Sequence, residues 1–189
     1  MSWGGSLGAL ALAGASLAAL SLYKDGPPPA HTGGFGEPTC RECHSDAGLN
    51  EPGGELSIAG APAVYQPGRT YQLEIVLRRG GMLRAGFQLA ARFAEGDAAG
   101  TAAGLLTPGD GRSKVIWDTL SHVAYVEHTQ AGTALRGDAG RWTVGWTAPA
   151  GNARGIVEFD VAGNAANDDD SPLGDFIYTH TLRVAPARR

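Results

Sequence analysis

The sequence predicts an all-β fold, an antiparallel Ig-like sandwich, and three observations lead to this class. The chain has 29 Gly and 11 Pro among 189 residues, which favours many turns over long helices. Apolar residues make up 43% of the chain, enough for a packed core. Short apolar or alternating runs recur at regular spacing beyond residue 54, with almost no stretch of helical period. We therefore expect two packed antiparallel sheets.

Eight segments are the expected strands. The clearest is Arg141–Thr147, where Trp142, Val144 and Trp146 share one face and polar or small residues share the other. We expect both tryptophans in the core rather than against a cofactor. The eight segments are Glu55–Ala59, Thr70–Leu77, Ala85–Phe93, Lys114–Trp117, His122–Glu127, Arg141–Thr147, Gly155–Ala162 and Phe176–Val184.

An apolar segment precedes this body. Leu7–Leu22 carries no charge and resembles the core of a signal peptide, with a small-x-small cleavage site at Ala19–Ser21. The uncharged stretch from Trp3 to Tyr23 would also form a helix of about 31 Å, the thickness of a bilayer core. A cleaved signal peptide, an uncleaved transmembrane anchor and a buried core helix all stay open. The first two place the domain in the periplasm or elsewhere outside the cytoplasm, and an uncleaved helix would anchor it to the inner membrane through residues 3–23.

The chain accordingly divides into three parts. Residues 1–24 are the signal peptide or anchor, residues 25–54 form a Pro/Gly-rich leader that opens with a stiff Gly-Pro-Pro-Pro spacer, and residues 55–185 form the sandwich. The net charge is −4 and no cluster of Lys or Arg is present. Nucleic acid is therefore excluded as a partner, since neutralising phosphates needs a basic face.

The leader contains the motif C-x-x-C-H, formed by Cys40, Cys43 and His44. This is the pattern of covalent haem c attachment, in which two thiols bond to the haem and the following histidine binds the iron. The sequence thus predicts one covalent haem c, with Cys40 and Cys43 as thioether anchors and His44 as proximal ligand. Haem of this type is attached outside the cytoplasm, which agrees with the apolar segment.

Two other uses of the cysteines stay open. A thioredoxin-type disulfide would follow a strand in a βαβ unit, and the flanks here are rich in Gly and Pro. A zinc site needs four ligands, whereas Cys43 and His44 are adjacent and the sequence has no second cysteine pair. The loop closed by a disulfide would be too small to stabilise the fold by itself.

The sixth iron ligand has several candidates, and a vacant site is a further alternative. Met82 lies in a Gly-Gly turn, where we expect it to be exposed. The histidines are His31, His122, His128 and His180.

A polar cluster interrupts the strands at 163–175. Its oxygens could bind calcium, although the spacing differs from an EF-hand loop and a solvated turn is the simpler expectation. The candidate calcium ligands are Asn164, Asn167, Asp168, Asp170 and Asp175.

At this point the sequence resembles a known family. The segments 65–71, 86–92, 142–149 and 155–159 are similar to the reeler domain, an extracellular β-sandwich. Further motifs are similar to exported bacterial relatives of the choice-of-anchor V type: these are Pro27–Gly33, Cys40–His44, Tyr125–Thr129 and Gly163–Asp168. The resemblance covers residues 27 to 184.

The resemblance also bears on individual residues. The recurring Tyr-x-x-His-Thr segment implies His128 as the distal ligand. Asp169 departs from the pattern, because a glycine often stands there. The chain ends at Arg189 without a C-terminal anchoring extension, so we expect any membrane attachment to use the N-terminal segment.

Together these features predict an exported monohaem c-type cytochrome that transfers electrons. We expect an electron carrier rather than an enzyme, with redox protein partners and membership of a membrane electron-transport complex if the anchor is retained. The alternative is an extracytoplasmic non-redox binding, adhesion or structural module with a C-x-x-C disulfide. A haem enzyme such as a peroxidase ranks last, because no distal His/Arg pattern can be identified.

Overall fold

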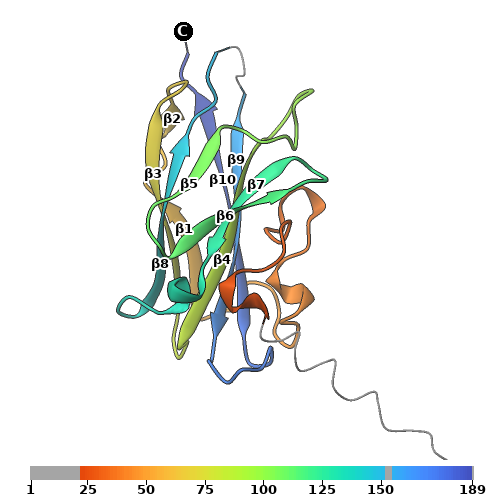
Figure 1. Cartoon of the computed structure of the whole chain (residues 1–189), viewed down its shortest axis with the longest axis vertical. Coiled ribbons are helices and arrows are strands. Elements are labelled where there is room, and N and C mark those ends of the chain that lie inside the picture. The colour runs from red at the N-terminus through yellow and green to blue at the C-terminus, as the bar shows by residue number, and fades with distance from the viewer. Residues whose placement is uncertain (1–21, 152–154, 189) are drawn as a thin grey trace, which may run out of the picture.

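Two β-sheets lie face to face in the computed structural model, which describes residues 22–151 and 155–188 (Figure 1). Four short 3₁₀ helices accompany the strands: η1 (Leu22–Asp25), η2 (Gly34–Gly36), η3 (Cys40–Glu42) and η4 (Gln130–Thr133). The strands are β1 (Gly54–Ala59), β2 (Val64–Tyr65), β3 (Thr70–Arg79), β4 (Arg84–Phe93), β5 (Leu105–Pro108), β6 (Ser113–Asp118), β7 (Val123–His128), β8 (Ala139–Thr147), β9 (Val157–Ala166) and β10 (Phe176–Pro186).

The sheets differ in size. One has the order β1-β3-β8-β5, and the other has the order β2-β10-β9-β4-β7-β6. Neighbouring strands are antiparallel except at one edge, where Val64 of β2 pairs in parallel with Ala185 of β10. The predicted antiparallel sandwich is therefore confirmed, with this short parallel pair as an addition.

All eight expected strands are present, with ends that shift by a few residues. The largest difference is at β9, which continues to Ala166, so the start of the polar cluster is a strand rather than a turn. The strands β2 and β5 were not predicted. They have two and four residues, too few to show an alternating pattern.

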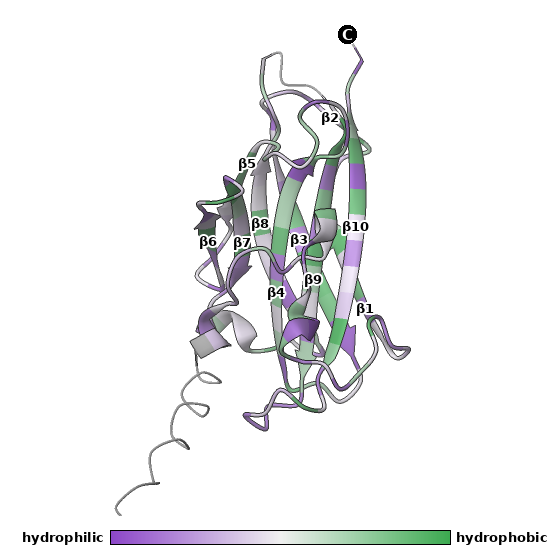
Figure 2. Cartoon of the chain, turned by 90° about the vertical axis from the view of Figure 1, so that its right-hand side faces the viewer, coloured by the Kyte–Doolittle hydropathy of each residue, from purple (hydrophilic) through white to green (hydrophobic). Residues whose placement is uncertain are grey.

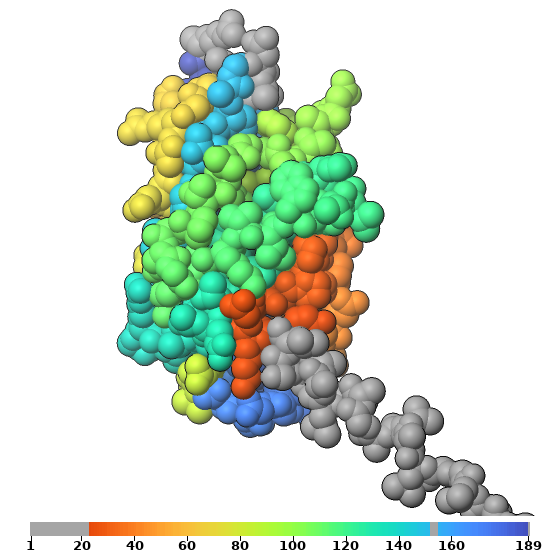
Figure 3. Space-filling view, viewed as in Figure 1, coloured from red at the N-terminus to blue at the C-terminus, as the bar shows by residue number. Residues whose placement is uncertain are grey.

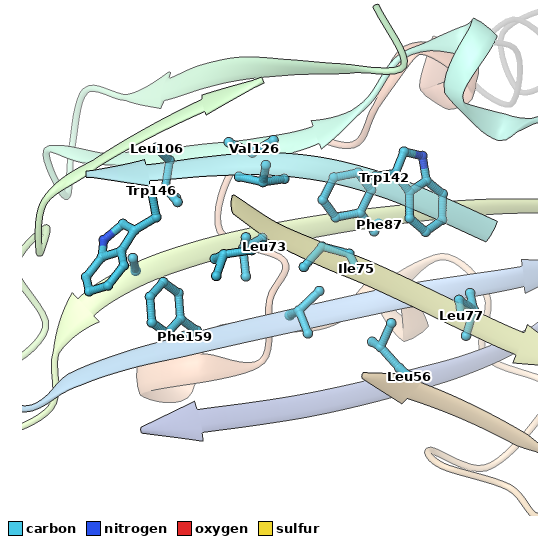
Figure 4. Close-up of a cluster of buried hydrophobic side chains, with 14 of the residues drawn as sticks. Leu56, Leu73, Ile75, Leu77, Phe87, Leu106, Val126, Trp142, Trp146 and Phe159 are labelled. Carbon is cyan, nitrogen blue, oxygen red and sulfur yellow. The ribbon is translucent and has the colours of Figure 1, made fainter. Parts of the chain in front are cut away.

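The core lies between the two sheets and is formed by the alternate, inward-facing residues of both (Figure 4). Trp142 and Trp146 of β8 are fully buried there, as predicted. The Trp142 ring packs against Phe87 with centroids 4.5 Å apart, and the Trp146 ring meets Phe159 edge-on at 4.8 Å. These contacts join β8 of one sheet to β4 and β9 of the other.

The predicted signal peptide or anchor falls mostly on residues 1–21, which lie outside the described residues. The described chain starts with η1, a single turn. Within residues 22–151 and 155–188, no helix is long and apolar enough to cross a membrane.

The leader crosses the outer face of the six-stranded sheet, the face turned away from the core (Figure 2). Its first part meets the β6–β7 side, where Lys114 pairs with Asp25 at 2.8 Å. Its last part meets β10, where Asn50 donates its backbone N–H to the carbonyl of Ile177. The leader thus spans the sheet from one side to the other.

Candidate functional site

The sheet face beneath the leader carries polar and charged side chains that are almost completely buried. A face on the outside of a sandwich is normally solvated, and here the leader contacts and covers Gln88, Arg92, Glu127, Asp160 and Asp175. The buried charges need partners, because removing an ion from water is costly. The residues are Gln88, Arg92, Glu127, His128, Glu158, Asp160 and Asp175.

Glu37 of the leader is the centre of the first group of contacts. One carboxylate oxygen lies 2.5 Å from the Arg92 guanidinium and accepts a hydrogen bond from the hydroxyl of Tyr125. The other accepts from the hydroxyl of Thr32 at 2.6 Å. Arg92 is 4% exposed and Glu37 11% exposed, so this is a buried ion pair between leader and sheet.

Glu127 and Gln88 form the second group. The Gln88 amide donates to Glu127 and to the carbonyl of Pro28, while its oxygen accepts from the backbone N–H of His31. Burial raises the pKa of Glu127 to about 7. Gly26 lies directly on this carboxylate, with a φ of +100° and no room for a side chain.

The C-x-x-C-H segment forms a tight turn around η3. The Thr39 hydroxyl accepts from the N–H of Arg41, and the N–H groups of Cys43 and His44 both donate to the Cys40 carbonyl. Burial raises the pKa of the Cys40 thiol to about 12, so it stays protonated at neutral pH. Cys43 is exposed, and both cysteines are free thiols.

His44 turns from this segment onto β9 and the start of β10. Its Nδ1 lies 2.7 Å from a carboxylate oxygen of Asp175, which is buried. The Asn164 amide donates to the same oxygen at 3.0 Å and lies 3.4 Å from both ring nitrogens of His44. The other Asp175 oxygen accepts from the backbone N–H of Asn167. Asp175 therefore connects His44 to the polar loop.

His128 lies at the end of β7, beyond the last residue of that strand paired with β4. Its Nδ1 lies 3.1 Å from the backbone nitrogen and 3.2 Å from the backbone oxygen of Phe87, and the ring also bonds to the backbone of Tyr23. Burial lowers the pKa of His128, so the ring is neutral. The ring rests on Gly86, which pairs with Asn164, so His128 and His44 lie over neighbouring strands.

The other predicted ligands are placed elsewhere. His31 pairs with Glu42 at 2.7 Å within the leader. His180 stands opposite the core residue Val161, so it points to the other face of the sheet from His44. His122 sits in the β6–β7 turn with a positive φ. Met82 is buried in the core, against the expectation of an exposed turn residue.

The polar cluster 163–175 is organised by contacts within the chain. Asp168 pairs with Arg84 and Asp170 with Lys24, while the Asn167 amide donates to Asp169. Among the residues described, no group of three or more His, Cys, Asp or Glu side chains is placed to hold a metal ion. Calcium binding stays a prediction.

The fold is similar to solved reeler domains. The Reelin-N domain of F-spondin is 21% identical over 78% of this chain and 97% of its own, with a TM-score of 0.49. Two fragments of the human F-spondin reeler domain are 21% and 20% identical, with TM-scores of 0.48 and 0.47, over 75% and 76% of this chain and 95% and 98% of theirs. No family model and no curated protein matches the sequence.

The prediction of a monohaem cytochrome that carries electrons is wrong. In the described part of the chain, no group of three or more His, Cys, Asp or Glu side chains is placed to hold a metal ion, and this includes Cys40, Cys43 and His44. The His128 side chain also does not fit the role of a second histidine ligand, because the backbone of Phe87 and Tyr23 engages its ring. Attachment of haem c at Cys40, Cys43 and His44 is a separate question and stays a prediction, as does His128 as a ligand.

The residues that hold the leader were not identified from the sequence. Gln88 and Arg92 fall at alternate positions of an expected strand, where polar residues indicate solvent. No pattern in the sequence predicts the burial of Glu37 and Glu127. A weak indication is present in Asn164 and Asp175, which are among the candidate calcium ligands and also contact His44.

Proposed function

We propose that this protein is an extracytoplasmic, non-redox binding or structural module on a reeler-like sandwich, with Cys40 and Cys43 joined as a disulfide. The proposal rests on one observation: the C-x-x-C-H turn holds the leader against the six-stranded sheet. His44 bonds to buried Asp175, and two residues further on Asp46 accepts the backbone N–H of Gly174 at 2.6 Å. The motif thus joins leader and sheet.

The turn geometry supports a disulfide. Cys40 and Cys43 are not bonded to each other in the structure, but side chains three residues apart on a 3₁₀ turn lie on the same side, so oxidation can join them. An exported protein folds where disulfides form and persist. The closed loop is small, so its effect on global stability is small. Its role is local, to hold the turn that presents His44 to Asp175.

The resemblance to exported bacterial choice-of-anchor V proteins supports the location. We propose that the module works in the periplasm or at another extracytoplasmic site, as a binding surface rather than a catalyst. It is held at the membrane through residues 3–23 if that segment stays uncleaved. N-terminal sequencing of the mature protein checks this, and a start near Leu22 would remove the anchor.

Absorption spectroscopy and intact mass together test the proposal. The chain is produced in a host that exports it and matures c-type haem. We expect no haem c bands and a mass two hydrogens below that of the reduced chain, because the two thiols are oxidised to one disulfide. Reduction with a dithiol should restore the two hydrogens.

A matched control is Cys40→Ser with Cys43→Ser, which should show no mass change on reduction and keep the far-UV spectrum of the sandwich. A covalently bound haem in the pyridine haemochrome assay would overturn the proposal. Two free thiols in the exported chain would overturn the disulfide.

A further inference from the structure

Strand β6 forms an edge of the six-stranded sheet, where it borders β7 alone among the described strands. It carries two exposed apolar side chains: Val115 is 41% exposed and Trp117 is 55% exposed. Leu120, in the turn that follows, is 91% exposed. This turn and its two strands face the viewer in Figure 3, in green and cyan. Edge strands are usually blunted by Pro, bulges or inward charges, because their open backbone pairs readily with another strand.

The hydrogen-bond pattern shows which residues of β6 face outward. The N–H of Thr129 donates to the carbonyl of Arg112, which makes these two a hydrogen-bonded pair just before the strand. Such pairs alternate along an antiparallel ladder. The backbones of Lys114, Ile116 and Asp118 therefore bond to β7, and those of Val115 and Trp117 point away from it.

The position of the facing sheet explains why apolar side chains remain exposed at this edge. Val115 stands opposite Val126, a core residue, so Val115 and Trp117 project on the core side of the sheet. They remain exposed because the facing sheet ends at β5, a strand of only four residues. Lys114 and Asp118 project on the opposite face.

The backbone and side chains of β6 are complementary to those of a second copy of the same strand. When two copies of β6 meet antiparallel about an axis at Ile116, Val115 of one copy faces Trp117 of the other. Both residues have outward backbone groups, so this register can form ladder hydrogen bonds. The same register places Lys114 of each copy, which also pairs with Asp25 of its own chain, opposite Asp118 of the other, so opposite charges face each other on both sides of the axis. A shift of two residues would place Lys114 opposite Ile116 and lose both charge pairs.

We propose that β6 is the interface of a homodimer, in which two six-stranded sheets join edge to edge into one continuous sheet. The isologous contact follows closed two-fold symmetry, so it ends at two copies and does not extend into a fibre. The tryptophan at its centre belongs to the residue types that dominate interface energetics. The dimer is independent of the function proposed above, because β6 lies outside the Cys40–His44 turn.

Sedimentation of the full chain over a range of concentrations tests the interface. We expect a reversible dimer. Val115→Pro removes an N–H that β7 does not use, so it should yield a monomer with an unchanged far-UV spectrum. Trp117→Lys should do the same by placing charge in the contact. The matched control is Leu83→Lys, which replaces an apolar residue that is 62% exposed in the β3–β4 turn and should leave the dimer intact.

A cross-link tests the register. In a Cys40→Ser/Cys43→Ser background, Ile116→Cys places the two new thiols opposite each other on the axis and should give a covalent dimer under mild oxidation. Ser113→Cys has no such partner and should cross-link at least tenfold more slowly. A monomer at every concentration would overturn the proposal. So would a dimer that survives both Val115→Pro and Trp117→Lys, or equal cross-linking at residues 113 and 116.

Discussion

Glu127 illustrates at the residue scale how the leader changes the chemistry of the sheet. The carboxylate lies under Gly26, accepts a hydrogen bond from Gln88 and has Lys114 at 3.7 Å. Desolvation outweighs these contacts and raises the pKa to about 7, from an ordinary value of 4.5. Glu127 therefore prefers the protonated form in the folded protein more than in the unfolded chain.

The raised pKa predicts a pH dependence. A group whose folded pKa is raised contributes stability that is fully present below 4.5 and is lost as pH rises through about 7. Glu127→Gln mimics the protonated form and keeps the hydrogen bond to Gln88. Relative to the natural chain, we expect it to add about 2 kcal/mol above neutral pH, since a pKa unit is worth about 1.4 kcal/mol and solvent access reduces the total.

Urea unfolding at a series of pH values measures this effect. His128 also titrates, and its lowered pKa destabilises the fold at acid pH, but it does so in both chains and cancels in the difference. A difference between the two chains that stays constant across neutral pH would contradict the assignment to Glu127.

At the scale of single elements, the leader is the segment whose conformation follows from no regular secondary structure. It has no regular strand or long helix, and its contacts with the sheet are polar at most points. The strongest is the buried pair of Glu37 with Arg92, supported by Thr32 and Tyr125. An ion pair of this kind is costly to break from one side, because the remaining charge stays buried without its partner.

Glu37→Gln therefore should detach the leader. We expect a local loss of about 3 kcal/mol or more, since Arg92 loses its countercharge. Limited trypsin digestion followed by mass spectrometry reports this loss as faster cleavage after Arg41, while the far-UV spectrum of the sandwich is retained.

The control is Glu42→Gln, which removes the pair with His31 at the surface, where the Glu42 side chain is 60% exposed. This change should cost less than about 1 kcal/mol and leave cleavage nearly unchanged. Equal cleavage rates for the two variants would show that the Glu37 pair does not hold the leader.

At the scale of the whole molecule, stability depends on the contact between the sheets. Trp146 of β8 is fully buried and packs against Phe159 of the facing sheet, with Tyr65 meeting it edge-on at 5.5 Å. Tyr65 in turn bonds through its hydroxyl to the carbonyl of Gly155. This group fills the end of the core near β2 and β5.

Trp146→Ala should destabilise the whole fold by about 3 to 5 kcal/mol, because it removes a large buried side chain and leaves a cavity. Trp117→Ala is the matched control, since Trp117 is exposed in the isolated chain, and it should change the free energy of unfolding by about 0.5 kcal/mol or less. Both are measured by denaturant unfolding in dilute solution, where any dimer is dissociated. Similar losses for the two tryptophans would contradict the assigned core.

The sequence by itself determined the sandwich and its core. Alternating runs such as Arg141–Thr147 have a period that is local, so the strand and its buried face follow from a few neighbouring residues. The same local information identified the C-x-x-C-H turn, but it could not predict where His44 lies. The position of His44 depends on Asn164 and Asp175, more than a hundred residues away, which both contact its ring.

The tertiary structure alone decided which face of the sheet is covered. Polar residues such as Gln88 and Arg92 show the alternation of a solvated face, and only the packing of a leader without any period buries them. The short strands β2 and β5 likewise exist because longer neighbours offer them a backbone to pair with. Long-range contacts leave no periodic mark on the chain, so periodicity predicted the strands and their core face but not the covered site on the other side.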